Sequence, residues 1–177
     1  RSSAASDVYK RQGQGKDKDN GLASLIEDGL NNLDLVHLDP WKADPRMDQA
    51  VINTNIMIEY YSTKNKTSLF EVGTEEGINK YSASELDAFL KKLKKFTDPK
   101  KFSRIKFAVI QSGVGLLGVE NTGTFSEQRC KDMISVCKSY GLLTKEHNGD
   151  YLDGEDIRRR FELGLDAINI APELGVE

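Results

Sequence analysis

The chain has 177 residues, of which 30% are charged, and its formal net charge is -3. This acidic balance, with no basic cluster interleaved with aromatic residues, argues against nucleic acid as the main partner. No apolar stretch reaches the roughly 18–20 residues of a membrane span, so the sequence predicts one domain with a hydrophobic core and no membrane association.

Residues 1–12 differ from the rest of the chain. They read RSSAASDVYKRQ and have neither hydrophobic periodicity nor a helix-capping pattern. They resemble the translation of a sequencing adapter, so we interpret them as a non-native leader. We therefore expect the folded domain within residues 13–177.

From residue 20 onward, segments of helical pattern and of strand pattern alternate. The predicted strands are short and nearly continuously apolar, which is typical of parallel strands buried on both faces. They cover residues 33–39, 69–74, 105–111, 142–147 and 166–170. In the predicted helices, apolar residues recur at helical spacing. The helices cover residues 20–32, 45–63, 83–97, 125–140 and 154–164.

Short polar patterns mark the ends of two of these helices. Ser82 with Glu85, and Thr124 with Glu127, have the spacing of a capping box at a helix start. Gly141 is placed to end the helix that begins near residue 125, because glycine readily adopts the left-handed conformation that follows many helices.

The alternation predicts an α/β fold with a parallel sheet. Either a doubly wound sheet or part of a (β/α)8 TIM barrel would satisfy it. A complete barrel needs about 250 residues, so the five predicted units would be the C-terminal part of a barrel that lacks its front strands. No GxGxxG follows the first strand and no P-loop is present, which disfavours dinucleotide-binding and NTPase folds.

Polar residues follow each predicted strand, and in α/β folds ligands and chemistry lie at these carboxyl ends. Asp39 ends the first strand and could act as a general base, a metal ligand or an acceptor for a substrate hydroxyl. It could instead cap the loop that begins at Pro40. His37 lies two residues earlier and so on the same side of the strand, either as a functional group or as a buried histidine bonded within the fold.

Glu75 and Glu76 follow the second strand, between two glycines. Adjacent carboxylates repel each other unless a cation, a proton or solvent intervenes. The two carboxylates are therefore suited to bind a divalent metal or a network of sugar hydroxyls. Glu75, which is nearer the strand, is the stronger candidate, and solvation of one of the two is the alternative.

The third strand ends in Gln111, Ser112 and Gly113. Small residues here would let backbone amides approach an anion, and Gln111 could donate a hydrogen bond to a substrate carbonyl or hydroxyl. An ordinary glycine-rich turn is the alternative. Gln111 and Gly113 are therefore candidate substrate-binding residues.

The densest polar cluster, residues 145–151, follows the fourth strand. His147 is a candidate acid–base group and metal ligand, because imidazole titrates near neutral pH and is the commonest protein ligand of metals. Asp150 is a second candidate catalytic residue, and Asn148 is a candidate substrate contact unless it forms only a turn. Asn169, near the end of the last strand, would orient a ligand or bond a neighbouring strand.

The chain contains two cysteines, Cys130 and Cys137. They lie seven residues apart on one predicted helix, a rise of about 10 Å that is too long for a disulfide within the helix. We expect reduced thiols, which fits a cytoplasmic protein.

The order of these motifs resembles the family of class II D-tagatose-bisphosphate aldolase non-catalytic subunits, from about residue 20 to the end. Members have I-H-L-D, V-I-G-T-E, Q-P-G-V and E-A-H-S-T-D-Y at four strand ends, and G-P-A after the last strand. The corresponding segments here are 36–39, 71–75, 110–114, 145–151 and 170–173. The sequence departs from this pattern at Ser112, which replaces Pro, and at Asn148 and Gly149, which replace Ser and Thr.

The resemblance implies a TIM barrel related to class II aldolases, in which a divalent ion, usually zinc, polarises the ketose carbonyl. It also implies a sugar-phosphate substrate and, for a non-catalytic member, a separate catalytic aldolase subunit as partner. The family's histidine-bearing third strand would precede residue 20, so we expect the metal site to be incomplete. Both an aldolase and its companion subunit fit the resemblance, and a metal-dependent sugar epimerase or isomerase is the alternative.

The candidate site residues fall into three groups. The candidate catalytic residues are Asp39, Glu75, His147 and Asp150. The candidate substrate-binding residues are Gln111, Gly113, Asn148 and Asn169. The candidate metal ligands are His147 and Glu75.

Overall fold

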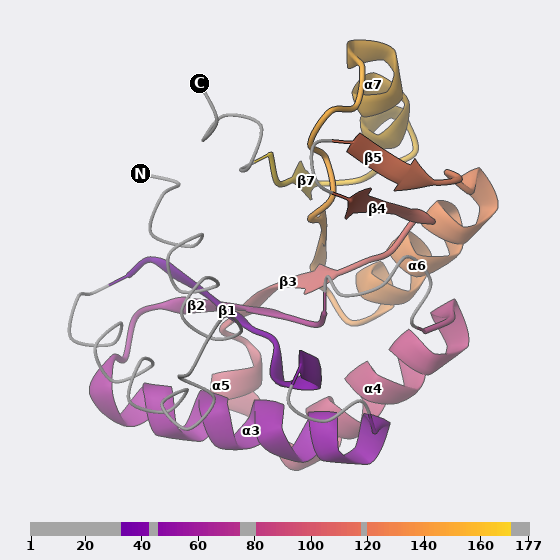
Figure 1. Ribbon diagram of the computed structural model, residues 1–177. Coiled ribbons are helices and arrows are strands. Elements are labelled where there is room, and N and C mark those ends of the chain that lie inside the picture. Colours follow the sequence, from indigo (N-terminus) through magenta and orange to yellow (C-terminus); the bar gives the residue numbers. More distant parts are fainter. Residues whose placement is uncertain (1–32, 43–45, 75–80, 118–119, 171–177) are drawn as a thin grey trace. The chain divides into compact units, whose positions relative to one another are not determined.

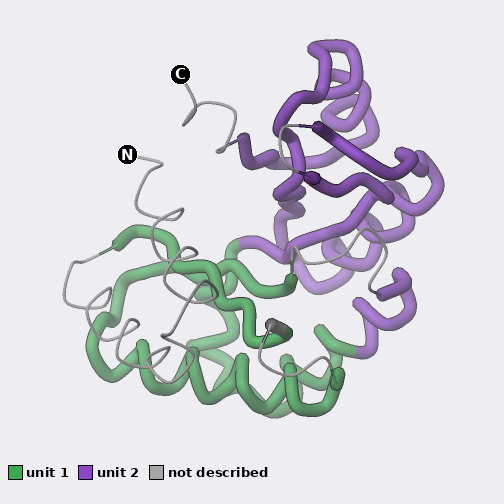
Figure 2. Tube along the Cα trace, in the orientation of Figure 1, with its two compact units in different colours: residues 1–74, 89–106 green, residues 75–88, 107–177 purple. Residues whose placement is uncertain are grey.

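The computed structural model describes residues 33–42, 46–74, 81–117 and 120–170 (Figure 1). Two compact units make up the chain, and each is described by itself (Figure 2). Unit 1 comprises residues 1–74 and 89–106, and unit 2 comprises residues 75–88 and 107–177. The expected leader, 1–12, and the expected helix 20–32 lie outside the described residues.

Unit 1 is built on parallel strands, as predicted. Strand β1 (Leu35–Leu38) pairs in parallel with β2 (Leu69–Val72), and this register places His37 opposite Glu71. The next strand, β3 (Ile105–Val109), is the neighbour of β2 in the sheet. The Phe70 amide of β2 donates to the carbonyl of Arg104, the residue before β3, at 2.8 Å. The apolar composition of these short runs explains their burial, since a parallel strand is covered on both faces.

Helix α3 (Met47–Lys64) connects β1 to β2 and packs against the short helix α5 (Pro99–Phe102) and the 3-10 turn η2 (Pro40–Lys42). Its Tyr61 ring meets Phe70 of β2 edge-on, with ring centroids 5.7 Å apart. Trp41 of η2 meets Phe89 in the same manner at 5.3 Å. Edge-to-face pairs of this kind stabilise a core beyond their buried area. The sequence did not predict η2 or α5.

Helix α4 (Ala83–Phe96) begins in unit 2 and ends in unit 1. Its predicted capping box is confirmed: the Ser82 amide donates to Glu85 Oε2 at 2.7 Å, and the Glu85 amide donates to Ser82 Oγ at 3.2 Å. These hydrogen bonds from Ser82 favour the charged carboxylate and lower the pKa of Glu85.

Unit 2 continues the same architecture with β3, β6 (Leu143–Glu146) and β7 (Ala167–Ile168) as parallel neighbours in that order. Helix α6 (Glu127–Ser139) connects β3 to β6, and α7 (Gly154–Glu162) connects β6 to β7. The α/β fold with a parallel sheet is therefore confirmed. Among the described residues, no helix has the length and apolar character that crossing a membrane requires.

The start of helix α6 differs from the prediction. Ser126, and not Thr124, caps it, because Ser126 Oγ accepts from the Arg129 amide at 3.3 Å. The Thr124 amide instead donates to the Gly113 carbonyl at 2.9 Å, which keeps this residue in an extended pairing. Gly141, at φ +74°, follows the end of α6 in the left-handed conformation that was predicted.

A two-stranded antiparallel hairpin lies between β3 and α6 in the chain and was not predicted. Its strands are β4 (Val114–Leu117) and β5 (Glu120–Gly123). Residues 113–123 contain four glycines and lack a clear apolar alternation, which is why the start of this segment was interpreted as a glycine-rich turn.

Candidate functional site

In unit 1, Asp39 follows β1 and is buried. Its Oδ2 accepts from Thr74 Oγ1 at 2.9 Å, and its Oδ1 accepts from the Trp41 amide at 3.2 Å. Asp39 therefore ties the loop after β1 to the end of β2, as the loop-capping alternative proposed. Its role as a catalytic group stays a prediction.

His37 and Glu71 form a buried polar pair between the adjacent strands β1 and β2. His37 Nε2 lies 3.0 Å from the Gly73 carbonyl and 4.0 Å from Glu71 Oε1. A carbonyl oxygen can only accept a hydrogen bond, so Nε2 of His37 carries a proton and donates a hydrogen bond to the Gly73 carbonyl. Glu71 is fully buried. Glu71 was not predicted, although an acid within the apolar run LFEV, in register with a histidine, is a signal that could have found it.

Glu75, predicted as a catalytic residue and metal ligand, lies outside the described residues, as does Glu76. Both roles of Glu75 stay predictions.

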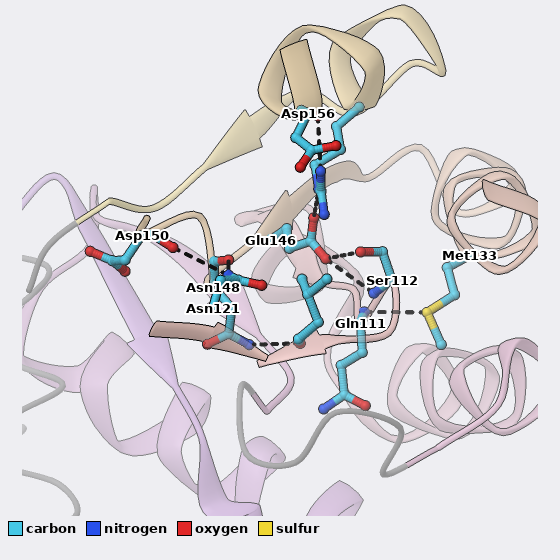
Figure 3. A network of polar contacts seen from close by, with 10 residues as sticks. Gln111, Ser112, Asn121, Met133, Glu146, Asn148, Asp150 and Asp156 are labelled. Carbon is cyan, nitrogen blue, oxygen red and sulfur yellow. Dashed lines mark hydrogen bonds and ion pairs between the residues drawn. The ribbon is translucent and has the colours of Figure 1, made fainter. Parts of the chain in front are cut away.

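In unit 2, a buried ion pair joins β6 to α7. Arg160 Nε lies 2.9 Å from Glu146 Oε2, and the guanidinium also donates to the Asp156 carbonyl at 2.9 Å. Glu146 Oε1 accepts from the Ser112 amide at 3.1 Å and from the Ser112 hydroxyl (Figure 3). The guanidinium carbon of Arg160 lies 4.2 Å from the centroid of the Phe125 ring. A buried carboxylate requires partners of this kind, and here the pair fastens the end of β3 and helix α7 to β6.

Arg160 was not predicted, and the sequence carries little signal for it. It is the last of three consecutive arginines, and the side chains of Arg158 and Arg159 are 65% and 55% exposed, whereas Arg160 is fully buried. Which arginine enters the interior depends on the orientation of α7, which only the packed structure determines.

The segment after β3 is fixed largely through its backbone. The Gln111 carbonyl accepts from Arg129 Nε at 2.6 Å, and the Gln111 amide donates to Met133 Sδ at 3.3 Å. Gly113 has φ +109°, and an added Cβ would lie 2.3 Å from the Thr124 carbonyl oxygen, so no other residue fits here without rearrangement. The substrate-binding roles of Gln111 and Gly113 stay predictions.

The structure brings His147 and Asn169 together at the ends of the adjacent strands β6 and β7. Asn169 Nδ2 lies 3.3 Å from His147 Nδ1. Since the amide nitrogen is a donor, Nδ1 accepts and Nε2 carries the proton of a neutral imidazole. A second residue that fixes the tautomer and orientation in this way is typical of catalytic and metal-binding histidines.

Asn148 and Asp150 lie in the loop after His147, and Asp150 is buried. Both offer their backbone carbonyls to Asn121 Nδ2 of β5, at 2.9 Å and 3.2 Å (Figure 3). Asn148 Nδ2 donates to the Val114 carbonyl of β4 at 3.4 Å. The hairpin thus contacts the loop that carries two of the candidate residues.

Cys130 and Cys137 are both free and buried, as predicted. Burial, and to a smaller extent nearby carboxylates, raise the pKa of each thiol to about 12. Neither cysteine is therefore a nucleophile at neutral pH.

No family model and no curated protein sequence matches this chain. Solved structures do match its fold. A probable tagatose 6 phosphate kinase from Sinorhizobium meliloti 1021 has a TM-score of 0.71 at 16% identity, over 95% of this chain and 46% of that protein. The YdjI aldolase from Escherichia coli K12 has a TM-score of 0.62 at 13% identity, over 93% and 51%.

A proposed fructose-1,6-biphosphate aldolase from Coccidioides immitis has a TM-score of 0.60 at 12% identity, over 85% of this chain and 52% of that protein. This chain therefore spans about half the length of these three proteins. At such low identities the likeness concerns the fold alone: the chain has an α/β fold of the kind found in aldolases.

Proposed function

We propose that this chain belongs to a (β/α)8 barrel protein of the aldolase type that acts on a ketose phosphate. The observation that carries the proposal is the pair of His147 and Asn169, which places an oriented imidazole at the carboxyl ends of two parallel strands. This is the edge at which barrel enzymes hold their substrates. The likeness to aldolase folds and the order of the sequence motifs support the same assignment.

Within this proposal, His147 is the acid–base group or a metal ligand, and Asp150 is a second catalytic carboxylate. Asp39 and Glu75 would complete the catalytic set. Hydroxyl groups of the sugar would be bound by amide and backbone groups of the remaining candidates. Those candidates are Gln111, Gly113, Asn148 and Asn169.

A divalent metal, with zinc as the first choice, fits the donor types present. Unit 2 contains the buried imidazole of His147, and unit 1, taken by itself, contains the buried imidazole of His37 and the buried carboxylate of Glu71. Zinc binds such nitrogen and carboxylate ligands in catalytic sites. When bound, the ion would polarise the substrate carbonyl and stabilise the enediolate. His37 could ligate through Nε2 only after giving up its hydrogen bond to Gly73.

A companion subunit without activity of its own is the second candidate. It is favoured by the number of acidic groups that already have internal partners. Asp39 accepts from Thr74 and Trp41, and Glu146 is paired with Arg160. Such a subunit would stabilise or stimulate a separate catalytic aldolase, and its own strand ends would serve structure.

The decisive experiment measures zinc content and cleavage of ketose bisphosphates, with the chain alone and together with a class II aldolase catalytic subunit. Triose phosphate released by the chain alone supports the enzyme, and release only above the rate of the partner alone supports the companion. Isomerised sugar without cleavage supports an epimerase or isomerase. Absence of zinc and of turnover in both settings contradicts the aldolase proposal.

The matched variants are His147→Gln and Lys131→Gln. Lys131 lies on the surface of α6, where it pairs with Glu127 at 2.6 Å. We expect His147→Gln to abolish activity of the chain alone and Lys131→Gln to leave it unchanged. Full activity of the His147 variant would remove His147 from the catalytic set.

A further inference from the structure

The β4–β5 hairpin is joined to the loop after β6 by side-chain amides from both partners. Asn121 Nδ2 lies 2.9 Å from the Asn148 carbonyl and 3.2 Å from the Asp150 carbonyl. In the reverse direction, Asn148 Nδ2 donates to the Val114 carbonyl at 3.4 Å. Figure 3 shows Asn121 reaching from the hairpin to this loop. A single NH2 group thus uses both of its hydrogens on two carbonyls of one loop.

The backbone of this loop adopts a conformation that needs external support. Gly149 has no room for a side chain, since an added Cβ would lie 2.6 Å from Ile168 Cγ1 and 2.8 Å from the Asn169 carbonyl oxygen. Tyr151 has φ +58°, which is unusual for a bulky residue. Strained backbone of this kind persists only where surrounding contacts hold it, and it concentrates at functional sites.

Asn169, which directly follows strand β7, also supports the loop. The Gly149 amide donates to the Asn169 carbonyl at 3.1 Å, and the Asn169 amide donates to the Glu146 carbonyl at 2.8 Å. The Asn169 side chain in turn contacts His147 Nδ1. The loop is therefore bonded both to the residue after β7 and to the hairpin, and Asn121 is a hairpin side chain that makes two of these bonds.

We propose that Asn121 is a positioning residue, which fixes the loop 148–150 and through it the orientation of His147 and Asp150. Removal of Asn121 takes its two hydrogen bonds away from the loop carbonyls. The loop then samples several conformations, the contact between Asn169 and the imidazole is made in only some of them, and His147 loses its single tautomer. The catalytic consequence rests on the proposed function, whereas the effect on the imidazole does not.

The chain offers a direct reporter, because it contains only two histidines. Nitrogen-15 NMR of the imidazoles, on the full chain at a fixed pH of 8, shows which ring nitrogen carries the proton. His147→Gln assigns the two sets of signals. His37, which lies in unit 1 and donates to Gly73, serves as an internal control for folding.

The test variants are Asn121→Asp, which has the same shape without the two donors, and Asn121→Ala. The control is Thr122→Val, since Thr122 Oγ1 contacts the Gly115 carbonyl within the hairpin at 3.4 Å. We expect both Asn121 variants to lose the single Nε2-protonated tautomer of His147 and to keep the His37 signals. The control should leave both histidines unchanged.

Two results would overturn the proposal. One is a His147 tautomer that is unchanged in both Asn121 variants. The other is an equal change at His37 and His147, which would make Asn121 a general stabilising residue. If the aldolase activity is established, kcat of Asn121→Asp should fall by about 10- to 100-fold with a smaller change in KM, as expected for misplaced groups. An inactive wild-type chain would contradict the proposed function and leave the NMR result to decide on Asn121.

Discussion

Unit 1 and unit 2 each contain one histidine near the end of a parallel strand, and the two imidazoles use their nitrogens differently. His37 donates from Nε2 to the backbone carbonyl of Gly73, in the next strand. His147 accepts at Nδ1 from the side chain of Asn169 and carries its proton on Nε2. The first arrangement fastens two strands together. The second fixes the orientation of the ring through a side chain, which is why the proposed catalytic site is centred on unit 2.

The two units also differ in how an arginine side chain is held, fully buried in unit 2 and half-buried in unit 1. In unit 2 a buried carboxylate is paired with a buried guanidinium, Glu146 with Arg160. In unit 1 the guanidinium of Arg104 donates to the Ser68 carbonyl at 2.8 Å and lies 4.7 Å from the Phe70 ring centroid. Burial of this group lowers the pKa of Arg104. Four variants test these differences, and the first is expected to have the largest effect.

Arg160→Met removes the cation of the buried pair and leaves the Glu146 carboxylate without it. We expect a loss of about 3–5 kcal/mol in the free energy of unfolding, measured by urea denaturation. Arg159→Met is the matched control, because its pair with Glu127 is exposed and screened by solvent, so its loss should change stability far less. Adding Glu146→Leu to Arg160→Met should recover much of the loss. Equal effects of the two arginine variants would contradict a buried pair.

Gly149→Ala tests the close approach of the loop to β7. The new Cβ would meet the Ile168 side chain and the Asn169 backbone, so we expect a loss of about 1–3 kcal/mol in unfolding free energy. Gly154→Ala is the control, since nothing lies within 4 Å of the position that its Cβ would occupy. Thermal unfolding of both variants should separate them, and a tolerated Gly149→Ala would show that the loop can relax.

Asp39→Ala tests the loop-fastening role in unit 1. It leaves Thr74 Oγ1 and the Trp41 amide without this acceptor, which we expect to lower the unfolding free energy by about 1–3 kcal/mol. Asp34→Ala, at an exposed position before β1, should change stability by less than about 0.5 kcal/mol. An Asp39 variant that loses activity at unchanged stability would instead assign Asp39 to catalysis.

The smallest expected effect is on the pH dependence of stability. It comes from Glu127 of α6, which pairs with Arg159 of α7. Hydrogen bonds from Lys131 and Arg159 lower the pKa of Glu127 from 4.5 to about 2. Because the folded pKa lies below the unfolded one, the stability from this group is present above about pH 4.5 and is lost as the pH falls towards 2. Melting temperatures of the wild type and Glu127→Gln should therefore differ at pH 5 and converge near pH 2. A constant difference over this range would contradict the assignment.

The framework of the fold could be predicted because strands and helices differ in composition and period. The apolar runs at β1, β2, β3 and β6, and the periodic runs at α3 and α4, were located to within a few residues. The hairpin was missed because its glycines and polar residues lack the alternation of a half-buried strand. The start of α6 was misplaced because Thr124 and Ser126 are equally good caps until the hairpin engages Thr124.

The candidate site could be predicted only where chemistry follows directly from position along a strand. His147 and Asn169 come together because β6 and β7 are adjacent and parallel. Glu71 and Arg160 were missed because their importance comes from burial, and burial depends on packing among distant segments. Asn121 belongs to an element that was not predicted, so its contacts with the loop could not be anticipated.

The two bonds at the base of the hairpin make this segment a self-contained insert. The Thr124 amide donates to the Gly113 carbonyl, and the Ser126 amide donates to the Ser112 carbonyl at 2.8 Å. The chain therefore leaves and rejoins the β3–α6 connection at nearly the same point. Residues 114–123 can be lengthened, exchanged or replaced by a short linker without changing the distance that this connection spans. An exchange of this hairpin would therefore change what contacts the loop after β6 while the ends of the β3–α6 connection stay the same distance apart.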